Sequence, residues 1–410
     1  MRAALRLGSV GFMERTDARP GQALAATLEA PGFYAGDPFP HYARLRREAP
    51  VAWNAELGYW AISKHADVVA ISRDPEAFCS GRGILTFEIG VEYPSPPTMM
   101  HTDPPDHTRY RKLVQPGFAP SRMRALAPRV RARAAELVER IEPGTECDVV
   151  ASLAVPFPLW IIAELLGIPE SDWPRFYQWS EASIPGATDW PPEECQRLQA
   201  EMHEYLLETT RARRVEPRDD VISVLAGAEV DGETLNDDEL VMFLNQLLVA
   251  GNETTRHAVS GGIAALAQHP DQWQRLAGDR ALVEPATEEI LRWTTPVISF
   301  MRTATRDTKV RGVDIAAGDP VLLLYASANR DEEEFGPTAP EFDVARDPNH
   351  EVALGFGPHF CLGAALARIE IGAMLDALLD RFETVTPAGD VERTASFVIA
   401  GISRAPVAFA

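Results

Sequence analysis

The chain has 410 residues, of which 46% are hydrophobic and 24% are charged, and its formal net charge is −21. The acidic excess argues against a nucleic-acid partner, and four widely separated cysteines without a CxxC pair argue against a disulfide framework or a structural zinc site. No segment approaches the run of about 18 apolar residues that a membrane span requires, and the stretch Met1–Asp17 is too poor in apolar residues for a secretion signal, so we expect a cytoplasmic protein without a membrane anchor.

The first hundred or so residues are predicted to hold a helix, a hairpin and a loop. Residues 1–30 are expected to form a loosely ordered segment, and the helix that follows ends at the break made by Pro50. Two short apolar and aromatic runs, Val51–Trp53 and Tyr59–Ile62, predict the strands of a hairpin. A proline-rich loop is expected at residues 94–97.

Helical periodicity dominates the middle of the chain, from about Pro104 to Arg292, with a proline-containing loop near 184–192. Strands are predicted at residues 321–325, 396–399 and 405–409. No glycine-rich dinucleotide fingerprint follows a strand, so no fused flavin or nicotinamide reductase is expected. The pattern predicts a mainly α protein with small β-sheets, folded as one domain over residues 1–410.

Near the C-terminus, a single cysteine lies between a glycine-rich loop and a periodic helix, in the run Leu354-Gly355-Phe356-Gly357-Pro358-His359-Phe360-Cys361-Leu362-Gly363. A thiolate just ahead of a helix is stabilised by unpaired amide donors and by the helix dipole. Gly355 and Gly363 let the backbone approach a flat ligand, and His359 offers a donor to an anionic group. An ordinary buried turn is the alternative. The loop resembles the haem-binding loop of the cytochromes P-450, in which the cysteine is the axial ligand of the iron.

A second motif lies inside a long helical pattern from Asp237 to His269, where the sequence reads Ala250-Gly251-Asn252-Glu253-Thr254-Thr255. A mid-helix glycine costs about 1 kcal/mol relative to alanine, and Thr254 can bond the carbonyl of Ala250 and bend the helix. A strained core helix is the alternative. The stretch resembles the oxygen-activation motif of the cytochromes P-450, and this match implies that Glu253 and Thr254 deliver protons during oxygen activation.

The resemblance covers roughly residues 30–410 and implies the cytochrome P-450 fold, with a long central helix over haem b. Glu289 and Arg292 lie one turn apart on a predicted helix, and Arg346 precedes the cysteine loop. These three match the Glu-Arg-Arg structural triad of the family, to which we assign a folding role.

Four nitrogen donors are expected to hold the haem propionates. His107 and Arg111 share one helix face at i, i+4 spacing, although a surface position is the alternative for Arg111. The resemblance implies that both bind a propionate, together with Arg302 and His359. One position departs from the family, because Leu354 stands where a phenylalanine is usual, and we expect a modest change in the reduction potential of the iron.

Eight basic residues and no acidic residue occur between Arg109 and Arg133. A solvated helix face is one reading. The other is a docking patch for an acidic partner, because opposite charges accelerate association. The resemblance implies that this partner is a ferredoxin or a flavodoxin, served by its own reductase, and we assign the docking to Lys112, Arg122 and Arg124.

The substrate is expected to be apolar, because no lysine or arginine lies between Arg82 and Arg109, in the segment that matches a substrate-recognition region. Several apolar side chains could line the cavity, with core packing as their alternative role. They are Ile84, Leu85, Phe87, Met99, Leu248, Ala250, Val297, Ile298, Phe300 and Phe397. The run Trp293–Val297 resembles bacterial members that oxidise steroids, terpenoids or branched alkyl groups.

The sequence therefore predicts a haem-thiolate monooxygenase that uses O2 and two electrons from a separate protein. A peroxide-using peroxygenase is the first alternative, and the Glu253-Thr254 pair argues against it, because such an enzyme needs no proton relay for oxygen activation. A haem-based binding or sensor protein without turnover is the second.

Overall fold

The computed structural model describes residues 19–30, 32–92, 98–183 and 190–410. The helices are α1 Gln22–Ala26, α2 Phe39–Glu48, α3 His65–Arg73, α4 Asp106–Val114, α5 Pro120–Glu139, α6 Pro156–Leu166, α7 Trp173–Ser183, α8 Pro192–Val215, α9 Val221–Ala226, α10 Asp237–Gln268, α11 Pro270–Gly278, α12 Val283–Thr294, α13 Tyr325–Ala328, α14 Glu332–Phe335 and α15 Ala364–Arg381. No helix within the described ranges is long and apolar enough to cross a membrane.

The strands are short and belong to several small sheets. They are β1 Val51–Asn54, β2 Tyr59–Ile62, β3 Phe78–Cys79, β4 Glu146–Asp148, β5 Glu229–Val230, β6 Glu233–Thr234, β7 Ser299–Ala304, β8 Thr308–Val310, β9 Val313–Ile315, β10 Pro320–Leu324, β11 Val385–Pro387, β12 Glu392–Arg393, β13 Ile402–Arg404 and β14 Pro406–Phe409. The largest sheet has five strands in the order β1-β2-β10-β7-β3. The mainly α class with small sheets, expected from the sequence, is confirmed.

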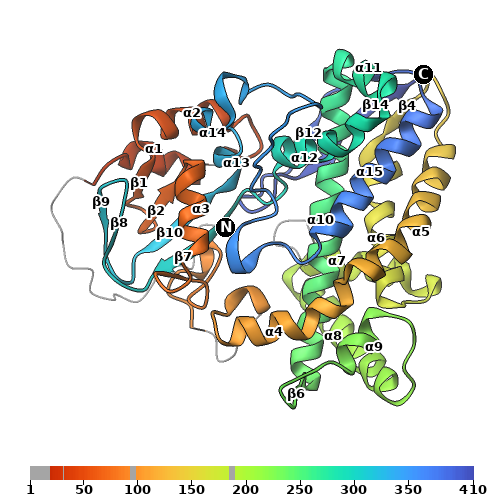
Figure 1. The fold of residues 1–410 in the computed structure, drawn as a ribbon, viewed down its shortest axis with the longest axis horizontal. Helices are drawn as coiled ribbons and strands as arrows, with labels where there is room; N and C mark the ends of the chain where they lie inside the picture. Colours follow the sequence, from red (N-terminus) through yellow and green to blue (C-terminus); the bar gives the residue numbers. More distant parts are fainter. Residues whose placement is uncertain (1–18, 31, 93–97, 184–189) are drawn as a thin grey trace.

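The five-stranded sheet joins segments that are far apart in the chain. The predicted hairpin forms β1 and β2, with Trp53 opposite Trp60, and β10 then pairs parallel to β2 and antiparallel to β7. Together with α1, α2 and α3, this sheet makes one part of the molecule, and most of the longer helices make the other part (Figure 1). The segment that precedes α15 lies between the two parts (Figure 1).

The 32-residue helix α10 is the central element of the helical part (Figure 1). Its start is fixed by a capping box, in which Asn236 and Glu239 each accept the backbone N–H of the other at 2.9 Å. Gly262 lets α12 pack closely, because a Cβ at this position would lie 2.8 Å from Cγ2 of Ile290. Close packing on several sides holds α10 rigidly, and with it the motif that contains Glu253.

One expectation about local structure is wrong, and a second can be compared with the structure only in part. Residues 396–399 form no strand, because the Ser396 hydroxyl accepts the N–H groups of Val398 and Ile399 in a local turn. Among the described residues, the only strand-like pairing of residues 396–399 is an isolated bridge between Ile399 and Val297. The expected loose segment is partly ordered, since α1 and the turn that follows bury Ala25 and Leu28. Residues 1–18, the loop at 94–97 and most of the loop at 184–192 lie outside the described residues.

Candidate functional site

Cys361 lies three residues before the start of α15, at the loop–helix junction that the sequence predicts. The Cys361 N–H donates to the Leu354 carbonyl at 2.9 Å, which closes the loop on itself. Gly357 has a φ of 69°, and a Cβ there would lie 2.2 Å from the Ser72 carbonyl oxygen of α3. Only glycine therefore allows the loop to pass this close to α3.

The surroundings of Cys361 set what its sulfur can bind. Burial raises the pKa of the Cys361 thiol, while the Gly363 N–H and the charge of Arg111 oppose that rise. A thiolate at this site is therefore best stabilised by a positive centre in direct contact. No group of three or more His, Cys, Asp or Glu residues in the described part of the chain could hold a metal ion. A single thiolate would suit an iron ion that is held in a macrocycle and needs only one ligand from the protein.

Positively charged and imidazole groups gather beside this loop. The rings of His107 and His359 lie 4.1 Å apart between centroids. Burial, followed by the charges of Arg302, His107 and Arg111, holds the pKa of His359 well below its usual value. The buried Nε2 of His107 has no hydrogen-bond partner among the described residues. The structure thus brings together the four predicted propionate donors, and such a cluster fits a ligand with carboxylate groups.

The α10 motif presents its hydroxyl on an open helix face. Thr254 Oγ1 donates to the Ala250 carbonyl at 2.8 Å, the bond expected from the sequence. Ala250 is exposed and Thr254 is half-buried, whereas the neighbouring residues Glu253 and Thr255 are buried. A ligand lying against this face of α10 would therefore meet the hydroxyl of Thr254 and the backbone at Ala250.

The side chain of Glu253 points into an ionic cluster between α10 and α7. Its Oε1 accepts a hydrogen bond from Nε2 of His257 at 2.7 Å, and its Oε2 lies 3.2 Å from Nη1 of Arg256. Arg256 Nη2 in turn donates to Glu181 of α7 at 2.6 Å. Burial acts to raise the pKa of Glu253, but the bond from His257 and the charge of Arg256 outweigh it, so the pKa lies below its usual value. The sequence reasoning missed His257, for which the signal was its i+4 spacing from Glu253.

The predicted triad forms as expected around a carboxylate with no exposed surface. Arg292 Nε and Nη2 donate to the two oxygens of Glu289, both at 2.7 Å, and Arg346 Nε donates to Oε2 of Glu289 at 3.1 Å. The remaining Arg292 donors reach backbone carbonyls of the segments that precede the cysteine loop. The triad therefore ties α12 to that stretch of the chain.

The residues predicted to line the substrate cavity occupy different environments. Leu248 and Met99 belong to the large core cluster of the helical part, and Ile298 belongs to a cluster beside the sheet. Phe87 and Phe397 meet edge to face, with their ring centroids 6.0 Å apart. Ile84 is buried, and Leu85, Val297 and Phe300 are half-buried. The contact between Phe87 and Phe397 joins two apolar segments that are far apart in the chain.

The basic stretch is partly neutralised inside the molecule. Arg109, Arg122, Arg129 and Arg133 form ion pairs with acidic residues of this chain, and the carboxylate paired with Arg122, at 3.2 Å, is Asp219. Lys112 and Arg124 are exposed, and neither forms an ion pair within the described ranges. The free charge available to a partner is therefore smaller than the sequence suggests.

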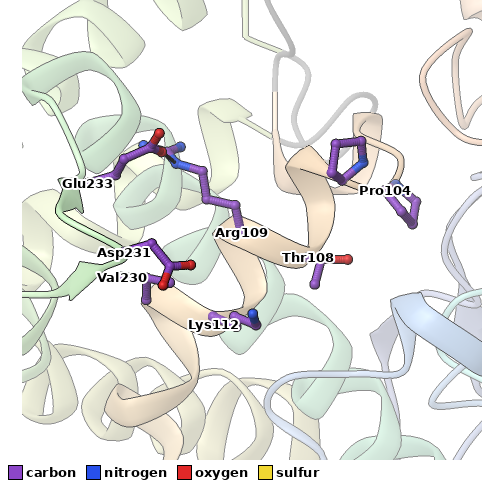
Figure 2. Close-up of a pocket in the computed structure, with 8 residues that line it drawn as sticks. Pro104, Thr108, Arg109, Lys112, Val230, Asp231 and Glu233 are labelled. Carbon is purple, nitrogen blue, oxygen red and sulfur yellow. Dashed lines mark hydrogen bonds and ion pairs between the residues drawn. The ribbon is translucent and has the colours of Figure 1, made fainter.

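A surface hollow of about 580 Å³ lies between α4 and the hairpin of β5 and β6 (Figure 2). Arg109 reaches across it toward Glu233, while Thr108 and Lys112 line the α4 side (Figure 2). None of the ten residues predicted for the substrate cavity lines this hollow. It is a feature of the outer surface beside Lys112, and no residue of α10 lines it.

Comparison with known proteins supports the same chemistry. Residues 161–408 match the family model of cytochrome P450. The chain is 38% identical to linalool 8-monooxygenase of Pseudomonas putida, over 83% of this chain and 88% of that protein, and 39% identical to a methyl-branched lipid omega-hydroxylase of Mycobacterium tuberculosis, over 89% and 90%. A cytochrome P450 of Mycobacterium marinum in complex with pseudoionone superposes with a TM-score of 0.84 at 32% identity, over 98% of this chain and 100% of that one. The chain belongs to the cytochrome P450 family.

Proposed function

We propose that this protein is a monooxygenase that hydroxylates an apolar small molecule of the terpenoid, steroid or branched alkyl class, with haem b as its cofactor. One observation carries the proposal. A lone loop cysteine, Cys361, lies beside a cluster of four nitrogen donors, and one of them, His107, has a buried ring nitrogen without a partner among the described residues.

The residues of this cluster would contact different parts of the cofactor. Cys361 would ligate the iron, and His107, Arg111, Arg302 and His359 would bind the propionates through charge-assisted hydrogen bonds. Bound haem with a thiolate ligand supplies the chemistry of O–O bond cleavage. Gly355 and Gly363 keep the loop backbone free of side chains beside the macrocycle.

Protons would reach the site through two neighbouring residues of α10. The Thr254 hydroxyl lies on the open face of the helix. Glu253 is a buried carboxylate whose pKa lies below its usual value, so it stays ionised at a lower pH than an ordinary glutamate. A carboxylate next to a hydroxyl can take up a proton and pass it on. The pair therefore favours activation of O2 over direct use of peroxide.

Two electrons per turnover would come from a ferredoxin or a flavodoxin with its reductase. Lys112 and Arg124 are exposed and form no ion pair with the described residues, so their charge could meet an acidic partner. Arg122 pairs with Asp219, a carboxylate that is 97% exposed, and such pairs contribute little stability. Arg122 can therefore exchange that partner for an acidic residue of the docking protein.

The substrate class follows from apolar surface and from the relatives. The segment that carries Ile84, Leu85 and Phe87 has no lysine or arginine up to Arg109 that could hold a carboxylate group of a substrate. The named activities of similar proteins include linalool 8-monooxygenase and steroid C26-monooxygenase. We therefore expect an apolar skeleton of terpenoid or steroid size.

An absorbance titration of the ferric protein tests this proposal. Terpenoids, steroids, branched fatty acids and aromatic acids are added in turn, and the spin-state shift of the haem band is followed. We expect a low-to-high-spin shift with an apolar member of the panel. A shift with aromatic acids alone would contradict the apolar assignment.

Peroxide release during turnover separates the alternatives. Thr254→Ala is expected to raise the peroxide released per O2 consumed and to lower the product yield. An unchanged yield and unchanged peroxide release would favour a peroxygenase or a haem sensor.

A further inference from the structure

His257 is the residue that orients Glu253. It lies one helical turn beyond Glu253, is 3% exposed, and bonds the Oε1 atom of that carboxylate through Nε2 at 2.7 Å. Its other ring nitrogen, Nδ1, accepts the backbone N–H of Ile402 in β13 at 3.1 Å. A backbone N–H can only donate, so Nδ1 carries no proton and Nε2–H is the donor to Glu253.

The two oxygens of Glu253 are consequently unlike each other. Oε1 is occupied by the directed bond from His257. Oε2 lies 3.2 Å from Nη1 of Arg256 but is buried without a hydrogen-bond partner among the described residues. The guanidinium itself is turned toward Glu181, to which it donates at 2.6 Å. Oε2 is therefore the oxygen of Glu253 that accepts no hydrogen bond from the described residues.

We propose that His257 is a positioning residue that holds the Glu253 carboxylate by Oε1 and leaves Oε2 as the atom that takes up and releases the proton passed toward Thr254. In each transfer an O–H bond forms at Oε2 with a proton that comes from water. That bond breaks again when the proton moves on, and the carboxylate returns to its starting state. The inference rests on the proposed role of Glu253 and Thr254 in proton delivery.

The charges around Glu253 predict what the loss of His257 would do. Arg256 and His257 face it from α10, and Glu181 and Tyr177 face it from α7. Arg256 is shared with Glu181, so it compensates the charge of Glu253 only in part. Without the bond from His257, burial is opposed by Arg256 alone, and the pKa of Glu253 rises. The carboxylate then keeps its proton to a higher pH and can rotate away from its present position.

Infrared spectroscopy of the haem-loaded protein reads the protonation of Glu253 directly. The C=O stretch of protonated Glu253 is identified as the band missing in Glu253→Gln, and its growth is followed as the pH is lowered. We expect this band to appear at higher pH in His257→Phe than in the wild-type protein. His257→Gln, which can still donate to Oε1, is expected to titrate like the wild type. Equal titration in the wild type and His257→Phe would overturn the inference.

Two further variants guard against an uninformative result. If His257→Phe does not fold, His257→Asn takes its place, because its shorter side chain cannot make the same bond and is expected to show the same shift. His203→Phe replaces an exposed histidine of α8 and is expected to leave the titration unchanged. If the Glu253 band titrated at a pH as high in His203→Phe as in His257→Phe, the shift could not be assigned to the loss of the His257–Glu253 bond.

Peroxide release then separates this inference from the proposed function. Glu253→Gln and Thr254→Ala are expected to release more peroxide per O2, and His257→Phe to do so to a smaller extent. If the first two variants behave like the wild type, the proton role of the pair fails. If they release more peroxide while His257→Phe matches the wild type in both assays, the pair keeps its role and only the assignment of His257 fails.

Discussion

Replacing Glu289 by glutamine removes the only negative charge of the buried triad. Arg292 would keep its own charge with no exposed surface, and Arg346 would keep its charge with 8% exposed. The three hydrogen bonds that these arginines make to Glu289, at 2.7, 2.7 and 3.1 Å, would lose their charged acceptor. The change therefore leaves two buried cations paired only with backbone carbonyls and a hydroxyl.

The size of the effect follows from the cost of an unpaired buried charge. Removing one partner of a buried ion pair destabilises a protein by about 3–5 kcal/mol. For a chain of 410 residues, the unfolding entropy converts this loss into a drop of about 3–6 °C in the melting temperature. The haem should be lost earlier than the helices, because the triad holds the chain that leads into the cysteine loop.

Thermal unfolding of Glu289→Gln, followed by circular dichroism and by haem absorbance, measures both effects. Glu48→Gln is the matched control, because it removes a carboxylate from exposed ion pairs with Arg44 and Arg47. We expect the control to have the same melting temperature as the wild-type protein. If Glu289→Gln also had that melting temperature, the folding role of the triad would be refuted.

Four further changes test other parts of the site. Leu354→Phe should shift the reduction potential modestly in a spectroelectrochemical titration, and an unchanged potential would mean that residue 354 does not tune the iron. Arg124→Glu should slow reduction by an acidic ferredoxin and flatten its salt dependence in stopped-flow experiments, and a wild-type salt dependence would exclude Arg124 from docking. Burial and a neighbouring carboxylate raise the pKa of Glu351 to about 7, so the folded state keeps a proton that the unfolded state has already lost. The free energy of unfolding should therefore fall as the pH rises through the window from about 4.5 to 7, and less so in Glu351→Gln. Gly262→Ala should destabilise by about 1–3 kcal/mol despite the better helix propensity of alanine, because the new Cβ would meet Ile290 at 2.8 Å. A Gly262→Ala protein as stable as the wild type in urea would contradict this packing.

Two matched variants calibrate these tests. Gly278→Ala adds a methyl group where no heavy atom lies within 4 Å, and it is expected to leave the urea midpoint unchanged or to raise it slightly. Arg306→Glu reverses an exposed charge outside the basic stretch. A slowing of electron transfer by Arg306→Glu as large as that by Arg124→Glu would point to net charge and not to a docking site.

Local features of the structure follow from the sequence because their causes are local. The hairpin of Val51–Asn54 and Tyr59–Ile62 needs only two apolar runs and a turn. The bond from Thr254 to Ala250 needs only the i, i+4 geometry of a helix. The position of Cys361 at a loop–helix junction follows from the glycines before it and the periodic helix after it.

Features that join distant segments could not be predicted in the same way. Nothing in the local pattern of residues 320–324 indicates that this strand pairs with β2 on one side and β7 on the other. The apolar composition of residues 396–399 predicts a strand, but the Ser396 hydroxyl accepts the N–H groups of Val398 and Ile399. This local bonding competes with a strand ladder, and composition alone does not reveal it. The neutralisation of Arg109 depends on Glu233 and Glu239, more than 120 residues away.

Turnover under isotopically labelled dioxygen tests the central claim most directly. The haem-loaded protein is supplied with a ferredoxin, its reductase and the apolar compound that gives the largest spin-state shift. We predict one labelled oxygen atom in the hydroxylated product, and a Thr254→Ala variant that consumes O2 but releases most of it as peroxide. A product without label, or a variant that forms labelled product as efficiently as the wild type, would contradict the account.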